Sequence, residues 1–266
     1  MTQRISEVEI PDTLFKYRDW SNAYHKRLIT NQEIYFARAS EFNDPFDSNI
    51  PVRWDLMTYE DCLQKNLDML NIIHKNVDQQ LVYQLAKKVT DEKTLWHPDA
   101  LARERPEQLK KWNSIMGLFS LSSVPDNILM WSHYSSNHQG FVVGFDSKAL
   151  LSDYEFDFME PINYQRSYPI ISGLEDQSSQ FYKKFFFKSE LWSYEQEWRI
   201  TKNHIEKRTV NLKPETITQI IFGCYATRET IEEGIKLIHK HLKNDIRILK
   251  AEKTMDTFGL IMKGIE

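Results

Sequence analysis

Apolar residues fall mostly in short runs or in alternation with polar ones, the pattern typical of β-strands. We predict strands at 13–17, 33–37, 117–121, 140–145, 161–166, 197–201, 210–212, 217–222, 246–248 and 260–262. Helices are predicted at 20–28, 126–134 (with Asp126 as N-cap), 177–188 and 227–242. Strands therefore come in clusters separated by irregular helices. This order predicts an α+β fold with mainly antiparallel central sheets.

The segment 59–89 has a different pattern, with an apolar residue at every third or fourth position. Such spacing predicts an amphipathic helix or a helical hairpin. A further helix is predicted at 106–114. No internal repeat and no Gly/Ser-rich linker interrupts the chain. We therefore predict a single domain over residues 1–266, with a helical insertion at about 57–115 that is either a buttress or a lid.

Composition narrows the functional classes. With 27% charged residues and a net charge of −4 in 266 residues, we expect no strong non-specific attraction to a polyanion, and a local basic groove is the alternative. No apolar segment approaches the 18 residues of a membrane-spanning helix, so we expect no membrane contact and a cytoplasmic location. Two cysteines are too few for a disulfide framework. Aromatic residues make up 13% of the chain, which supplies both core and surfaces that grip planar ligands.

The first half of the chain carries two short motifs whose side chains are suited to binding a ligand. Arg18 ends the first predicted strand, next to Tyr17, and a guanidinium there can bind phosphate or carboxylate. A surface ion pair is the alternative. The second strand carries Tyr35 and Phe36, and the loop 42–47 follows with the sequence FNDPFD. Its Asp and Asn side chains either contact a ligand or cap their own loop.

The second half carries two more. His133 lies in the sequence WSHY and either transfers protons or has a structural role. Glu195 and Glu197 are two residues apart at the start of a predicted strand, which places them on one face if the strand extends that far. Paired carboxylates can share acid–base work, and a surface Glu–Arg ladder is the alternative. We expect Trp198 in the core and Arg199 in an ion pair.

Taken in order, the motifs FKYR (15–18), IYF (34–36), FNDPFD (42–47), FS (119–120), 130–146 and YEQEWR (194–199) resemble the bacterial family known as domain of unknown function 2971. The resemblance extends from about residue 14 to 223 and leaves out the predicted helical insertion. This family name implies no reaction.

The order of these motifs is also similar to that of the ADP-ribosyltransferase superfamily, although no clear Ser-Thr-Ser motif is present. The similarity implies NAD as substrate, with Glu197 stabilising an oxocarbenium-like transition state and Glu195 as a further catalytic residue. It implies no metal. His133 is a catalytic candidate from its own acid–base chemistry, outside the usual triad of that superfamily. The residues implied to bind NAD are Arg18, Tyr17, Tyr35, Phe36, Ser40, Asn43, Asp44, Trp131 and Tyr134.

Three functional classes follow. The first is an NAD-consuming transferase or glycohydrolase in bacterial conflict or phage defence, with a nucleotide as substrate and a protein or nucleic acid as acceptor. The second is a metal-dependent hydrolase or nuclease that uses Asp44, Asp47, His133, Glu195 and Glu197. The third is a non-enzymatic module that binds a nucleotide or a protein. Acceptor and oligomeric state are not predicted by the sequence.

Overall fold

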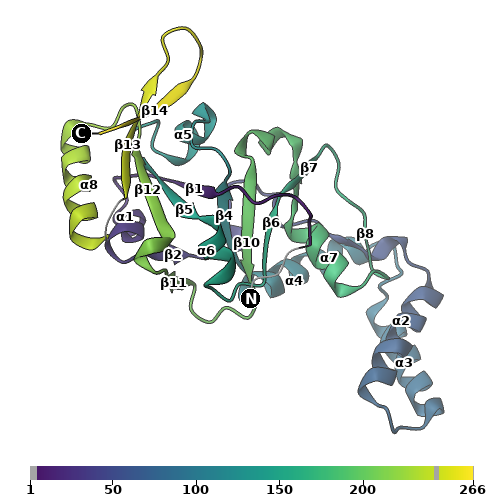
Figure 1. The fold of residues 1–266 in the computed structure, drawn as a ribbon. Helices are drawn as coiled ribbons and strands as arrows, with labels where there is room; N and C mark the ends of the chain where they lie inside the picture. Colours follow the sequence, from purple (N-terminus) through teal and green to yellow (C-terminus); the bar gives the residue numbers. More distant parts are fainter. Residues whose placement is uncertain (1–4, 243–245, 266) are drawn as a thin grey trace. The chain divides into compact units, whose positions relative to one another are not determined.

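The computed structural model describes residues 5–242 and 246–265. Contacts divide the chain into two compact units. The first comprises Met1–Phe42, Ile115–Tyr164 and Glu190–Glu266, and the second comprises Asn43–Ser114 and Gln165–Ser189. The expected insertion thus forms a unit together with a later segment of the chain. Figure 1 follows the elements of both units along the sequence.

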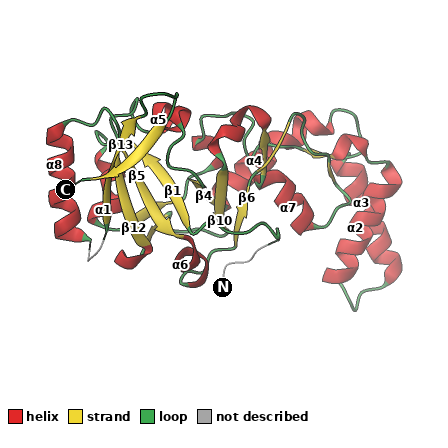
Figure 2. Cartoon of the chain, turned by 45° about the horizontal axis from the view of Figure 1, so that its top comes forward, coloured by secondary structure: helices red, strands yellow, loops and turns green. Residues whose placement is uncertain are grey.

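An eight-stranded sheet is the centre of the first unit (Figure 2). Its strand order is β14-β13-β12-β5-β1-β4-β10-β6, and only β12 and β13 pair in parallel. The predicted α+β class with a mainly antiparallel sheet is confirmed. The strands are β1 (Thr13–Arg18), β4 (Gly117–Ser122), β5 (Phe141–Asp146), β6 (Phe158–Pro161), β10 (Glu197–Lys202), β12 (Ile217–Phe222), β13 (Arg247–Lys253) and β14 (Leu260–Gly264).

Helices and a small two-stranded sheet complete this unit. Asn127, and not the expected Asp126, caps α5, because its side chain accepts the backbone N–H groups of Leu129 and Met130. The elements are α1 (Ala23–Thr30), α5 (Ile128–Tyr134), α6 (Ser147–Ser152), α8 (Arg228–His241), η1 (Ala39–Glu41), η3 (Glu190–Glu195), η4 (Pro214–Thr216) and the pair β2 (Glu33–Tyr35) with β11 (Thr209–Asn211).

The two faces of the large sheet differ in character. Alternate side chains such as Leu14, Phe119 and Ile200 enter the main apolar core. The opposite face is apolar around Phe15 and Tyr17, which pack in a smaller cluster. Further along the same face the buried side chains are polar or charged: Ser122, Glu160, Glu197, Arg199 and Thr201. Buried polar groups need hydrogen-bond or ion-pair partners inside the protein, so this polar face is the candidate functional part of the sheet.

The second unit is mainly helical. The expected helical hairpin is confirmed as α2 (Tyr59–Ile73) and α3 (Gln79–Lys93). The next helix, α4 (Ala100–Ile115), begins earlier than predicted and contains Pro106 in its interior. The predicted helix at 177–188 ends sooner, as α7 (Gln177–Phe185), and its last residues form a strand. The remaining elements are β3 (Val52–Arg53), η2 (Trp54–Leu56), β7 (Asn163–Gln165, which spans the change between units), β8 (Ile171–Ser172) and β9 (Phe187–Ser189).

Among the helices of the described residues, none combines the length and the apolar character needed to cross a membrane.

Candidate functional site

The large sheet parts between β1 and β4. β1 is in register with β5 along six residue pairs, but with β4 at only one, Phe15 with Ser122. Beyond that pair the Nζ of Lys16 donates a hydrogen bond to the carbonyl oxygen of Ser120. A side chain thus bridges strands that the backbone does not join. This opening in the backbone pairing lies toward the end of β1 that carries Arg18.

Cations gather on the β1 side of this opening. Burial and the neighbouring Arg18 hold the pKa of Lys16 well below its usual value, although Glu197 and Glu195 act to raise it. Burial lowers the pKa of Arg18 to about 10. The Arg18 guanidinium has no ion-pair partner among the residues that the structure describes. Burial and Arg18 also lower the pKa of His25 to about 4, so this imidazole is neutral at neutral pH.

Two glutamates form a fixed corner between η3 and β10. Gln196 between them has a left-handed backbone, with φ of 43°, which turns the chain sharply. The Ser122 hydroxyl donates to the Glu195 carbonyl oxygen at 2.7 Å, and the Ser123 N–H donates to that of Gln196 at 3.0 Å. The β4 end therefore holds the Glu195–Glu197 corner in one conformation.

The Glu195 carboxylate is buried and is held from α5. The Tyr134 hydroxyl donates to its Oε1 at 2.6 Å. One residue earlier, the exposed His133 places its Nδ1 3.0 Å from the hydroxyl of Tyr194. Two adjacent residues of α5 thus contact two adjacent residues of η3. A phenol donor stabilises a carboxylate without neutralising its charge.

The Glu197 carboxylate lies in a buried ion pair, as expected for Arg199. The guanidinium contacts Glu197 Oε1 through Nε at 2.8 Å and through Nη2 at 2.7 Å. Arg199 is completely buried, and its guanidinium lies 5.3 Å from the centre of the Phe42 ring. Trp198 points to the opposite face and packs in the main core, as expected.

Arg18 and Glu197 lie on opposite faces of the sheet. Glu197 is opposite Ser122 on β4, and Ser122 is opposite Phe15 on β1, so these three share a face. Arg18 is three residues beyond Phe15 and hence on the other face. Lys16 lies in the opening, and its charge interacts with both the Arg18 guanidinium and the Glu197 carboxylate.

The structure distributes the other expected NAD-binding residues over several environments. Phe36 and Trp131 are completely buried in the apolar core, which leaves no ring face for a ligand. Tyr17 is almost as buried, and its hydroxyl donates to the Val124 carbonyl oxygen at 2.8 Å. Tyr35 and Ser40 are exposed, with the Tyr35 hydroxyl 3.1 Å from the carboxylate of Glu41.

Asn43 and Asp44 belong to the second unit. Asp44 lines a cavity there. Within the described part of the chain, no group of three or more His, Cys, Asp or Glu side chains is arranged to hold a metal ion.

Sequence reasoning missed Lys16 and the part played by Ser122. A signal for Lys16 was present, since a lysine between Phe15 and Tyr17 interrupts an otherwise apolar strand. Ser122 gave none, because its contact with Glu195 joins residues far apart in the sequence.

Comparison with known proteins adds one match. No curated protein and no solved structure matches the chain. Residues 130–200 match the model of a family described as protein of unknown function (DUF2971). The match spans most of α5, the Glu195–Glu197 corner and most of β10, and does not include β1. Over this segment the expected resemblance is confirmed: the part of the chain that carries Tyr134, Glu195 and Arg199 is similar to the DUF2971 family.

Proposed function

We propose that this protein cleaves NAD between nicotinamide and ribose and transfers the ADP-ribosyl group to water or to a protein or nucleic-acid acceptor. One observation carries the proposal: two buried carboxylates, Glu195 and Glu197, are fixed together where the sheet opens, near the cations of β1. The resemblance of the motifs to ADP-ribosyltransferases points to NAD.

The chemistry requires a negative charge beside the ribose. When the bond from C1′ to the nicotinamide nitrogen breaks, the electron pair leaves with nicotinamide and positive charge develops on the ribose. A carboxylate held nearby stabilises this charge more than the ground state. Water then supplies its oxygen to C1′ and releases a proton.

We assign this role to Glu195 and a positioning role to Glu197. Tyr134 donates to Glu195 as a neutral group and leaves its negative charge in place. Glu197 lies against the guanidinium of Arg199, and these two contacts hold its carboxylate in place. The proposal therefore moves the main catalytic role two residues from the position that the resemblance implied.

The phosphates of NAD are proposed to lie near Arg18 and Lys16. A half-buried guanidinium without an anionic partner is unfavourable, and a diphosphate would compensate it. Arg18 lies on the face opposite Glu197, so the dinucleotide would reach both residues where β1 and β4 are not paired.

The test is release of nicotinamide from NAD by the purified protein. We expect Glu195→Gln to lower kcat by about 100-fold. Glu190→Gln, which changes an exposed glutamate on the same helix η3, is the matched control and should keep full activity. Arg18→Gln should raise KM. Unchanged kcat in Glu195→Gln would remove Glu195 from the mechanism.

The ion pair of Glu197 favours a second candidate, a non-enzymatic nucleotide-binding module. A carboxylate already bound by a buried arginine is suited to holding structure. Such a module would melt at a higher temperature with NAD, lose that shift in Arg18→Gln, and form no product.

A further inference from the structure

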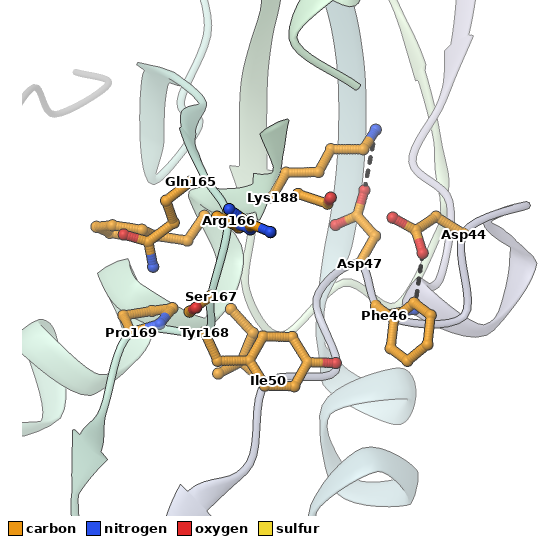
Figure 3. A pocket seen from close by; sticks show the side chains of 12 residues that line it. Asp44, Phe46, Asp47, Ile50, Gln165, Arg166, Ser167, Tyr168, Pro169 and Lys188 are labelled. Atoms are coloured by element: carbon orange, nitrogen blue, oxygen red, sulfur yellow. Dashed lines mark hydrogen bonds and ion pairs between the residues drawn. The ribbon is translucent and has the colours of Figure 1, made fainter. Parts of the chain in front are cut away.

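The second unit contains a cavity of about 280 Å³ (Figure 3). Its walls come from the FNDPFD loop and from segments on both sides of α7. Its lining residues are Asp44, Phe46, Asp47, Ile50, Gln165, Arg166, Ser167, Tyr168, Pro169, Phe187, Lys188 and Ser189. All twelve belong to this unit.

Asp44 has an unmet hydrogen-bond acceptor at this cavity. The side chain is 5% exposed, and its Oδ1 accepts the backbone N–H of Phe46 at 2.9 Å. The other oxygen, Oδ2, is buried without a donor among the described residues. Figure 3 shows it directed toward the side of the cavity where Asp47 lies. Because an unpaired buried acceptor is costly, this oxygen indicates a place for a ligand N–H group.

The charged side chains around Asp44 differ in whether they are free to contact a ligand. Asp47 and Lys188 are both buried and form an ion pair at 3.4 Å. Arg166 is exposed, has no ion-pair partner among the residues described, and projects over the cavity (Figure 3). The cavity thus offers one buried acceptor and, at its open side, one cation that can bind carboxylate or phosphate through two N–H groups.

Two aromatic rings stand beside these charges. Phe46 and Tyr168 have ring centres 6.4 Å apart at an angle of 56°, and they are 58% and 45% exposed. Exposed rings beside a carboxylate favour an apolar or planar body with a positive or N–H-bearing end. Ile50 and Pro169 extend the apolar wall.

We propose that this cavity binds a small molecule with a nitrogen donor at one end and an acid at the other. The nitrogen group donates to Asp44 Oδ2, the acid binds Arg166, and the body packs on Phe46 and Tyr168. Free amino acids and nucleoside monophosphates both have this chemistry. The inference does not depend on NAD cleavage, since its residues lie in the other unit.

The experiment uses the full chain and two sets of probes, the twenty amino acids and four nucleoside monophosphates. Thermal shift finds the binding probes, and calorimetry measures Kd. We expect at least one probe to bind, and Asp44→Asn and Arg166→Gln each to weaken it by about tenfold or more. The set that contains the binder distinguishes a carboxylate ligand from a phosphate ligand.

Glu175→Gln is the matched control. Glu175 also has a buried oxygen without a partner, but it lies outside the cavity and should leave Kd unchanged. Asp44→Asn without ligand should melt no lower than the wild type, because it removes a buried negative charge and keeps the Phe46 contact. The proposal is overturned if no probe binds at millimolar concentration, or if the binder has equal affinity for wild type and Asp44→Asn. It is also overturned if an analogue without the nitrogen donor binds equally well.

Discussion

Arg199→Met isolates the energetic role of the buried ion pair on the polar face of the sheet. Arg199 is completely buried, and contacts of 2.7 and 2.8 Å join it to Glu197. Glu160, also completely buried, is directly opposite Arg199 on β6. Methionine fills much of the arginine stem but removes the charge, so the buried carboxylate of Glu197 loses its cation.

Arg199→Met should lower the free energy of unfolding by a large amount. Removal of one partner of a buried ion pair costs about 3–5 kcal/mol, because the other charge remains desolvated. For a chain of this size each kcal/mol lowers the melting temperature by about 2 °C, so the expected shift is about 6–10 °C. Replacement of both partners, as Glu197→Gln with Arg199→Met, removes both charges. It should restore at least about 2 kcal/mol relative to the sum of the single losses.

The coupling energy between Glu197 and Arg199 is measured on four proteins: the wild type, Arg199→Met, Glu197→Gln and the double variant. Their thermal and urea unfolding is followed by circular dichroism. Arg228→Met is the control: Arg228 pairs with Glu232 at the same distance of 2.7 Å but is 88% exposed, and its loss should not change the melting temperature. If Arg199→Met is as stable as the control, the pair does not stabilise the corner. The positioning role of Glu197 would then be wrong.

Three further changes test other parts of the account. Burial lowers the pKa of Lys184 to about 8, so the unfolded chain binds the extra proton between pH 8 and 10.5. Wild-type stability relative to Lys184→Met should therefore rise across that window, by up to about 3 kcal/mol, in urea unfolding; a flat difference would contradict this. In NMR titrations His25 should have a pKa near 4 that rises in Arg18→Gln, and no rise would place Arg18 too far away. Tyr134→Phe should lower nicotinamide release by about tenfold with the melting temperature nearly kept, because Glu195 loses a charge-assisted hydrogen bond; unchanged release would contradict the contact.

Local patterns predicted the fold class well because each strand and helix carries its own periodicity. The hairpin α2–α3 followed from apolar spacing alone, and β12 and α8 were predicted within a residue or two. The predicted bounds were wrong where the local pattern was compatible with more than one start or end of an element. The predicted strand at 161–166 corresponds to the last residue of β6 and the whole of β7, and the helix predicted from residue 106 began at Ala100.

The site was predictable in its acidic part and not in its geometry. Glu195 and Glu197 were identified because two carboxylates preceded an apolar strand, and the Arg199 ion pair was expected. The face of Arg18 depended on the register of β1 with β4, which no local pattern specifies. The aromatic motifs misled the prediction because a sequence does not show which rings are buried. Phe36 and Trp131 stand among polar residues in the sequence, as in a ligand site, but both rings are buried in the core.

The most direct test of the central claim is nicotinamide release from NAD by wild type, Glu195→Gln and Glu190→Gln, measured by chromatography at equal protein concentration. The account predicts release by wild type and Glu190→Gln, and about 100-fold less by a folded Glu195→Gln. No release by the wild type, or equal release by all three proteins, would contradict it.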